Sequence, residues 1–307
     1  MTAVLLIDNI VQYCDKEYVS LDGNCGCRDG YCNHPSGKCS GSCYDCLYHV
    51  HYPDRAPENA KKEYDCPKML YHYVCQYSYL YATELLCAFE HEWSFIKDFP
   101  FYHILSLGCG GCADLMAFDV LRQKRCPVTP FSYTGIDVNT LWYHIHSKIR
   151  DYCSNNNIGF QTQYYDVFEA FNDGSITNIN IIVISYLLSY LYNTNQIKRI
   201  DSLVEQLIKQ VIMEKKTPLL LIINDVNSYK RGRNYFSHFE NAIRRYGLTI
   251  NKSEYKYFDK DNLYDGQKIG SPYAVSEVAF NIPDNIQNNY HASISINATV
   301  QLLVEVS

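Results

Sequence analysis

The part of the chain after Phe99-Pro100 constrains the fold most, because short apolar runs alternate there with longer segments of helical periodicity. The apolar runs predict five strands, at residues 102–107, 132–136, 159–164, 180–185 and 219–224. The intervening segments predict helices at 114–122, 141–154, 196–214 and 235–246. Strands that are apolar along their whole length are typical of a parallel sheet covered by helices on both faces. The sequence therefore predicts an α/β domain.

Three further β-like segments follow, at 249–258, 273–280 and 293–306. In the last one, apolar residues alternate from Ile294 to Val306, as expected of a strand in a half-buried sheet. We expect this tail to add an antiparallel pair at one edge of the sheet.

A glycine-rich turn joins the first predicted strand to the first predicted helix. From Ile104 the sequence reads Ile-Leu-Ser-Leu-Gly-Cys-Gly-Gly-Cys-Ala-Asp-Leu. Glycines at such a turn let the backbone approach a ligand and bend steeply into a helix N-terminus. The spacing is not the full dinucleotide pattern, because Ala113 stands where that pattern has its third glycine.

Acidic residues end the next two predicted strands. Asp137 closes the second strand, where a carboxylate can hold two ribose hydroxyls. Asp166 follows the third strand and precedes Val167 and Phe168, so it could accept an adenine amino group while these two residues contact the ring. The turn and the two acids together indicate a nucleotide-containing ligand.

These three motifs, in this order, resemble those of the class I S-adenosylmethionine-dependent methyltransferases over about residues 99–227. The resemblance implies a Rossmann-like, seven-stranded, mostly parallel sheet with an antiparallel C-terminal strand, and methyl transfer from S-adenosylmethionine. It also implies roles for single residues. Gly108, Cys109 and Gly110 would line the methionine part, Asp137 would bind the ribose, Asp166 the adenine amine beside Val167 and Phe168, and Ser185 and Tyr186 would lie near the transferable methyl.

Two positions depart from the first motif of that family: Ser106 replaces the usual acid, and Cys112 replaces the third glycine. For a poor nucleophile, methyl transfer needs a general base, and the local candidates are Tyr186 and Asp225. Asp225 is equally suited to cap the following turn. The alternative function is a non-catalytic interaction protein that keeps the cofactor fold and recruits a partner through its N-terminal part.

Cysteines and negative charge are both concentrated before residue 100. Ten of the 14 cysteines lie in the first 87 residues. Residues 1–100 carry 8 basic and 14 acidic side chains, whereas residues 101–307 carry 19 of each, so the whole net charge of −6 belongs to the N-terminal part. We predict a Cys-rich metal-binding module with a tyrosine-rich helix at 1–98, and a methyltransferase-like domain at 99–307.

Residues 21–50 have too little apolar side-chain mass for a core of their own, which favours a metal that holds the segment together. Zinc takes four Cys or His ligands, so the available set could supply two structural zinc sites, with one site and spare thiols as the alternative; the spacing does not decide the pairing. That set is Cys25, Cys27, Cys32, His34, Cys39, Cys43, Cys46 and Cys66.

The spacing of Cys39, Cys43 and Cys46 also matches the cluster ligands of radical S-adenosylmethionine enzymes, which is a minor alternative. Against it, Asp45 stands where an aromatic residue usually precedes the last cysteine, and no long βα barrel follows. Four other cysteines, in or beside predicted helices, are interpreted as small buried apolar residues: Cys75, Cys87, Cys126 and Cys153.

Residues 67–95 show helical spacing of apolar and aromatic residues, and Pro67 suits a first turn. We expect this helix to pack over the cofactor pocket and to help define the substrate site. Its tyrosines are interpreted as amphipathic packing residues rather than as an aromatic cage.

Charge and hydropathy limit the partners. The N-terminal module is acidic, so a nucleic acid is possible as methyl acceptor but not favoured. No apolar run approaches the about 20 residues of a membrane helix, and the N-terminus lacks a basic start, so we expect a cytoplasmic protein without a membrane partner. A small molecule, a protein side chain and RNA stay open as acceptors. The basic residues of the second half are interpreted as solvated: Lys230, Arg231, Arg233, Arg244 and Arg245.

Overall fold

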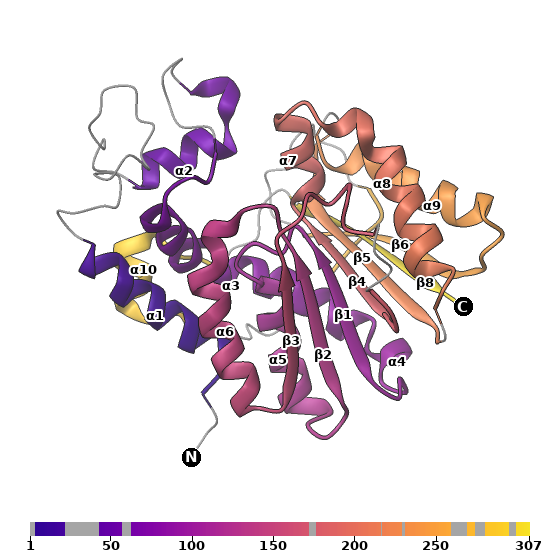
Figure 1. Cartoon of the computed structure of the whole chain (residues 1–307), viewed down its shortest axis with the longest axis horizontal. Coiled ribbons are helices and arrows are strands. Elements are labelled where there is room, and N and C mark those ends of the chain that lie inside the picture. Colours follow the sequence, from indigo (N-terminus) through magenta and orange to yellow (C-terminus); the bar gives the residue numbers. More distant parts are fainter. Residues whose placement is uncertain are drawn as a thin grey trace.

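An eight-stranded sheet forms the centre of the protein, in the order β3-β2-β1-β4-β5-β8-β6-β7 (Figure 1). The computed structural model describes residues 4–21, 43–56, 63–171, 176–215, 217–228, 231–258, 269–273, 280–294 and 299–307. The strands are β1 (Tyr102–Leu107), β2 (Phe131–Ile136), β3 (Ile158–Gln163), β4 (Ile181–Ser185), β5 (Leu219–Val226), β6 (Ile250–Tyr257), β7 (Ser271–Pro272) and β8 (Thr299–Val306).

Strands β1 to β5 pair in parallel, which confirms the predicted α/β fold and its mostly parallel sheet. Strand β8 runs antiparallel between β5 and β6, as predicted for the tail. The predicted number of seven strands was wrong, because β7 adds an eighth beside the end of β6. Strand β7 has only two residues, too few for the alternation of apolar and polar residues by which a strand is recognised in a sequence. Most of the strand predicted at 273–280 lies outside the described residues.

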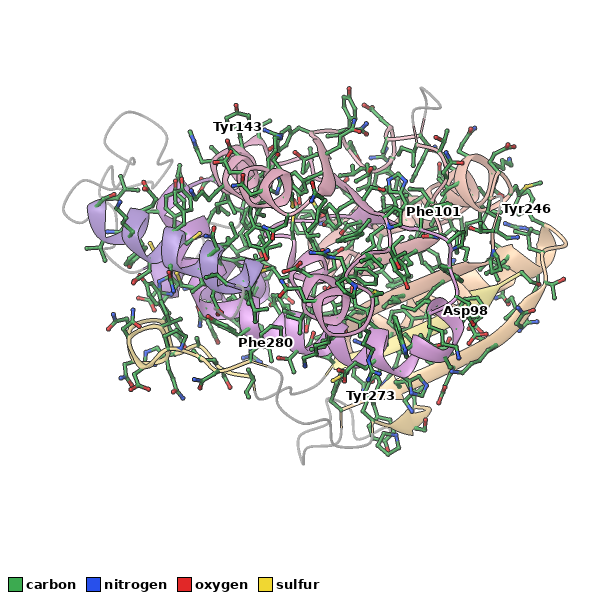
Figure 2. All side chains as sticks on the ribbon, turned by 90° about the horizontal axis from the view of Figure 1, so that it is seen from below. Asp98, Phe101, Tyr143, Tyr246, Tyr273 and Phe280 are labelled. Atoms are coloured by element: carbon green, nitrogen blue, oxygen red, sulfur yellow. The ribbon has the colours of Figure 1, made fainter. Side chains whose placement is uncertain are left out.

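Helices cover both faces of the sheet. The helices α5 (Ala113–Arg125) and α6 (Tyr143–Asn155) lie on one face, and α7 (Leu187–Asn193), α8 (Ile200–Leu207) and α9 (Phe236–Arg245) lie on the other. Alternate residues of β4 serve the two cores: Ile181 and Val183 pack with the α5 side, and Ile182 and Ile184 with the α8 side. The side chains fill both layers (Figure 2). The helix predicted at 196–214 is divided, since a 3₁₀ turn precedes α8 and a π-helical turn follows it.

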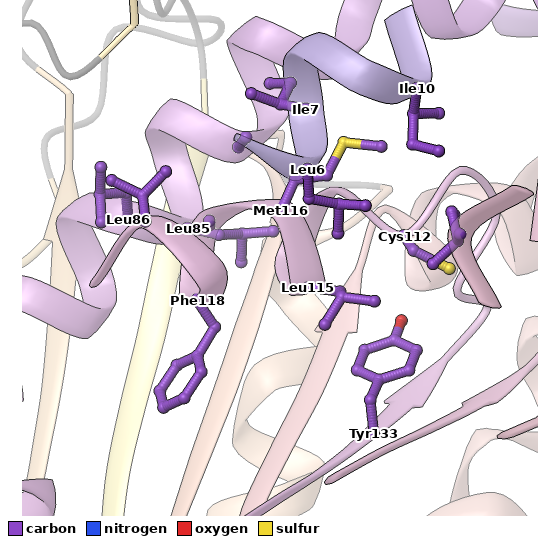
Figure 3. Packing of buried hydrophobic residues seen from close by; sticks show 14 of the residues in the cluster. Leu6, Ile7, Ile10, Leu85, Leu86, Cys112, Leu115, Met116, Phe118 and Tyr133 are labelled. Carbon is purple, nitrogen blue, oxygen red and sulfur yellow. The ribbon is translucent and has the colours of Figure 1, made fainter. Parts of the chain in front are cut away.

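Three of the four described α-helices before β1 pack on the α5 side of the sheet, whereas the second one packs on the third in a separate small cluster. The four helices are α1 (Leu6–Ser20), α2 (Cys43–His51), α3 (Pro67–His91) and α4 (Trp93–Ile96). The long helix predicted at 67–95 is confirmed as α3 and α4, with Pro67 in its first turn. Buried residues of α1 and α3, such as Leu6 and Leu85, share one core with Met116 and Phe118 of α5 (Figure 3). The division into domains at residue 98 stays a prediction.

The chain returns to the N-terminal helices near its end. The short helix α10 (Asp284–Tyr290) packs against α3 beside α1 (Figure 1). The Tyr290 hydroxyl donates to Asp15 Oδ1 at 2.7 Å, which links α10 to α1. Among the described helices, none combines the length and hydropathy that a bilayer span requires. Cys75, Cys87, Cys126 and Cys153 are buried, as predicted.

Candidate active site

The glycine loop lies at the carboxyl end of β1, where it enters α5. Gly108 and Gly110 have φ angles of +69° and +46°, a region that residues with a Cβ disfavour. A Cβ on Gly108 would lie 3.2 Å from Leu187 Cδ1, so the loop also packs against the start of α7. The backbone N–H groups of Gly108 and Cys109 donate to the carbonyl oxygen of Ile136, at 2.8 and 3.0 Å. These bonds fix the loop to the end of β2.

Asp137 follows β2 and faces this loop. Its Oδ2 accepts a hydrogen bond from the Gly110 N–H at 2.8 Å, and its Oδ1 accepts one from the Asn139 N–H at 2.9 Å. Burial raises the pKa of Asp137, and the two backbone donors oppose that shift. Each carboxylate oxygen keeps a second lone pair, so Asp137 can still accept hydrogen bonds from a ligand.

Asp166 follows β3 on the same edge of the sheet. Its Oδ1 accepts a hydrogen bond from the Phe168 N–H at 3.1 Å, and its Oδ2 lies 3.6 Å from Arg199 Nη1. The Arg199 guanidinium carbon lies 3.7 Å from the centroid of the Phe168 ring. Arg199 therefore covers the ring that the resemblance assigns to adenine contact.

A cavity of about 580 Å³ lies at the carboxyl edge of the sheet, beside the glycine loop. Cavities at this edge are where ligands bind in open α/β sheets. Cys109 and Phe168 do not line it; both side chains are buried. The other predicted cofactor residues do line it: Gly108, Gly110, Asp137, Asp166, Val167 and Ser185.

A second cavity, of about 370 Å³, adjoins the first one. Four lining residues belong to both cavities: Tyr64, Tyr73, Tyr186 and Tyr190. Part of its wall is formed by three tyrosines of α3: Tyr73, Tyr77 and Tyr81. The sequence analysis interpreted these tyrosines as packing residues. We call this second cavity the tyrosine cavity. The helix α3 therefore borders both cavities, as the sequence predicted for the cofactor side.

Glu84 of α3 lines the tyrosine cavity and is 1% exposed. Its carboxylate accepts hydrogen bonds from the Tyr186 hydroxyl at 2.9 Å, from Asn224 Nδ2 at 2.9 Å and from Thr299 Oγ1 at 2.9 Å. Burial raises the pKa of Glu84 to about 7, although these donors oppose the shift. An ionisable group whose pKa lies near neutrality, beside a cavity, is suited to proton transfer.

The sequence analysis did not identify Glu84 as a site residue. One feature of the sequence could have indicated it: Glu84 follows Tyr77 and Tyr81 at helical spacing, so an acidic residue continues the aromatic face of α3. Its partners could not be found from the sequence, since Asn224 and Thr299 lie 140 and 215 residues away along the chain.

The two predicted general bases occupy different places. Tyr186 lines both cavities and has a φ of +55°, which directs the chain sharply from β4 into α7. Asp225 lines neither cavity, is fully buried, and accepts the backbone N–H groups of Leu188 and Ser189 at 3.0 and 3.1 Å. Asp225 therefore caps the first turn of α7. The sequence allowed a capping role for Asp225, but at the turn that follows it in the chain.

Beneath the glycine loop lies a group of buried polar residues. Cys112, at the position where the resemblance expects glycine, has a φ of +59°, which costs roughly 1 kcal/mol for a residue with a Cβ. Burial would raise the pKa of its thiol, but the hydrogen bond with Cys109 and the charge of His146 lower the pKa below its usual range. The His146 ring has partners at both nitrogens: Nε2 is 2.7 Å from the Gly110 carbonyl oxygen, and Nδ1 is 2.9 Å from the Tyr164 hydroxyl.

The predicted N-terminal zinc module stays a prediction. Cys43 and Cys46 lie on α2 and Cys66 directly precedes α3. Cys43 and Cys66 belong to one small buried cluster with Leu47 and Met69, and the half-buried Cys46 packs against it. The other five predicted ligands lie outside the described residues: Cys25, Cys27, Cys32, His34 and Cys39.

Several of the basic residues interpreted as solvated are engaged within the chain, and for Arg233, which is buried, that interpretation was wrong. Arg231 Nη2 lies 2.8 Å from Asp54 Oδ2, Arg233 is buried and donates to Asn227 Oδ1 at 2.6 Å, and Arg245 Nη2 lies 3.2 Å from Glu205 Oε1. Lys230 lies outside the described residues. Among the described residues that line the tyrosine cavity, Arg231 is the one arginine or lysine, and its charge is already paired with Asp54.

No known sequence family matches the chain, and none of the curated protein sequences does. Solved structures that resemble it include the plantazolicin methyltransferase BpumL in complex with SAH, at 14% identity, with 96% of this chain and 99% of that chain covered and a TM-score of 0.39. A putative class I S-adenosylmethionine-dependent methyltransferase from Listeria monocytogenes shows 10% identity, coverage of 98% and 88%, and a TM-score of 0.48.

A third similar structure is TrmK of M. capricolum in complex with S-adenosylhomocysteine, at 11% identity. The likeness covers 70% of this chain and 66% of that chain, with a TM-score of 0.35. All three scores lie below 0.5, so none of these likenesses assigns a function to the chain.

Proposed function

We propose that the protein is an S-adenosylmethionine-dependent methyltransferase that binds its cofactor in the larger cavity and its methyl acceptor in the tyrosine cavity. The observation that carries the proposal is the convergence of the glycine loop, Asp137 and Asp166 on one cavity that shares Tyr186 with a second one. Two adjoining cavities are what a transfer between two ligands requires.

The residues around the larger cavity fit an adenosyl amino acid. The left-handed backbone at Gly108 and Gly110 leaves room for a ligand to approach the loop. Asp137 keeps lone pairs for the ribose hydroxyls, and Asp166 is placed to accept from the adenine amine. The indole of Trp142, beside Gly110, adds an apolar wall to the same cavity.

Tyr186 and Glu84 are proposed to remove the proton of the acceptor. When bound, S-adenosylmethionine supplies an electrophilic methyl group on a sulfonium sulfur. The Tyr186 oxygen would take the proton that the acceptor atom gives up when it is methylated. Tyr186 gives its own proton to Glu84, whose carboxylate lies 2.9 Å from the hydroxyl. The pKa of about 7 suits Glu84 to this exchange near neutral pH.

The acceptor is proposed to be a small molecule or a single side chain. A volume of about 370 Å³ is within the range of small-ligand pockets. The tyrosines favour an acceptor with an apolar or cationic surface, since aromatic faces attract both. A nucleic acid stays less favoured, because Arg231 is already paired with Asp54.

The test is an isothermal titration of the purified full chain with S-adenosylmethionine, alongside Asp137→Ala. Asp151→Ala is the matched control, because Asp151 is an exposed aspartate on α6 that lines neither cavity. We expect the wild type and the control to bind and Asp137→Ala to bind more weakly. A wild type that does not bind would leave only the non-catalytic alternative.

A further inference from the structure

We propose that Cys109, Cys112 and His146 bind a structural zinc ion beneath the glycine loop. This site is separate from the ligands predicted in the N-terminal module. It also does not depend on the proposed function, because none of the three side chains lines either cavity.

The three side chains converge from two elements. The glycine loop contributes Cys109 and Cys112, and α6 contributes His146. The two sulfur atoms and one ring nitrogen all lie within 4.8 Å of one another. In a tetrahedral zinc site with bonds of about 2.3 Å to sulfur and about 2.0 Å to nitrogen, the ligand atoms lie about 3.5 Å apart. A small closure of the three side chains would bring these three atoms to that spacing and leave one position for a fourth ligand.

The backbone at Cys112 supports a role for its side chain. Its left-handed conformation favours glycine, and the resembled family has glycine there. A cysteine at a position that favours glycine indicates that the thiol has a use, since strained residues persist where the surroundings require them. Space is also reserved for Cys109: a Cβ on Gly135 of β2 would lie only 2.8 Å from Cys109 Sγ.

Asp114 is the candidate for a fourth ligand, although its carboxylate oxygens lie outside the group of three whose ligand atoms are all within 4.8 Å of one another. This residue is 3% exposed, and its Oδ1 accepts a hydrogen bond from the Tyr133 hydroxyl at 2.9 Å. Its Oδ2 is buried and has no hydrogen-bond partner among the described residues. Asp114 lies two residues after Cys112, and Figure 3 shows Tyr133 and Cys112 in the same buried layer. A buried carboxylate oxygen without a partner is costly unless a cation or donor meets it.

The surroundings of His146 suit a metal ligand. Whichever ring nitrogen binds the metal, the other one keeps a partner, either the Gly110 carbonyl oxygen or the Tyr164 hydroxyl. Such partners orient the rings of histidines that bind metals.

Burial favours a metal over a redox role for the same two cysteines. The Cys-x-x-Cys spacing at a helix N-terminus also occurs in disulfide oxidoreductases, whose reactive thiol is accessible. Here Cys109 is 7% exposed and Cys112 is fully buried. Structural zinc sites are closed in this way, with all ligands from the protein.

The test compares the zinc content of the full chain with that of Cys112→Gly. Glycine fits the backbone of residue 112, so this variant removes a ligand while it keeps the loop conformation. Cys126→Ser is the control, because Cys126 is a buried thiol outside the group. Any zinc in the N-terminal module would be present in all three proteins, so the test uses the difference in zinc per chain between the wild type and each variant. Cobalt substitution adds a second readout, the charge-transfer absorption of thiolate-bound cobalt.

We expect the wild type and Cys126→Ser to hold one zinc more per chain than Cys112→Gly, and the cobalt absorption to be weaker in Cys112→Gly. Equal zinc content and equal cobalt spectra in folded wild type and Cys112→Gly would overturn the proposal. So would a disulfide between Cys109 and Cys112 in the protein as purified, located by mass spectrometry of its proteolytic peptides. Should Cys112→Gly fail to fold, Cys109→Ser is the second variant, with the same expected and contradicting results.

Discussion

Replacing Glu84 by glutamine tests whether a buried ionisable carboxyl joins α3 to the carboxyl edge of the sheet. Burial raises the pKa of Glu84 from 4.5 to about 7 in the folded chain. Between these values the folded state keeps a proton that the unfolded state has released, so stability falls as the pH rises from 4.5 to 7. Below 4.5 both states are protonated, and above 7 both are ionised. A shift of this size corresponds to about 3 kcal/mol in the free energy of unfolding.

Glutamine has nearly the same shape and cannot ionise, so Glu84→Gln loses this dependence on pH. We expect the unfolding free energy of Glu84→Gln minus that of the wild type to rise by about 2.5 kcal/mol between pH 5 and pH 8. The loss of one hydrogen bond in the variant shifts the whole curve by a constant and leaves its slope unchanged. The measurement is urea unfolding at each pH, followed by the fluorescence of Trp93 and Trp142.

Glu90→Gln is the matched control, because Glu90 is a half-buried glutamate on the same helix that lines neither cavity. The curve of this control should run parallel to that of the wild type. If Glu84→Gln also runs parallel to the wild type from pH 5 to pH 8, then Glu84 has an ordinary pKa, and the proposed proton transfer through it is wrong.

Two further substitutions separate the roles of the predicted general bases. Tyr186→Phe removes a hydrogen-bond donor to the buried Glu84 carboxylate, so we expect a loss of about 1–3 kcal/mol in unfolding free energy at pH 8 and a smaller loss at pH 5. Tyr192→Phe is the control, because Tyr192 lies on α7, which begins directly after Tyr186, and lines neither cavity; it should change stability by less. A loss for Tyr186→Phe that is equal at both pH values would contradict the pairing with an ionised Glu84. Asp225→Ala removes the cap of α7 and should cost about 1–2 kcal/mol in thermal or urea unfolding, with S-adenosylmethionine affinity nearly unchanged. A variant of normal stability would contradict the capping role.

Local patterns were enough to predict the sheet and one edge of the site. The strands β1, β2, β4 and β5 are apolar runs, and parallel strands bring their carboxyl ends to one edge. The glycine loop, Asp137 and Asp166 follow β1, β2 and β3, which are neighbours in the sheet, so their approach to one cavity follows from the order of the elements.

Contacts between distant segments could not be predicted in the same way. Glu84 meets Tyr186, Asn224 and Thr299 because α3 packs across the ends of β4, β5 and β8. The group of Cys109, Cys112 and His146 likewise needs the packing of α6 against the loop. The departure at Cys112 was visible in the sequence, but its meaning depends on a histidine 34 residues later.

The titration of the full chain with S-adenosylmethionine tests the central claim most directly, when it is made with Asp137→Ala and Asp151→Ala under the same conditions. We predict one binding site per chain in the wild type and in Asp151→Ala. In Asp137→Ala the affinity should fall by about tenfold to a hundredfold, since hydrogen bonds to a charged group contribute about 1.5–3 kcal/mol. Equal affinity of Asp137→Ala and the wild type would contradict the placement of the ribose, and no binding by the wild type would contradict the account as a whole.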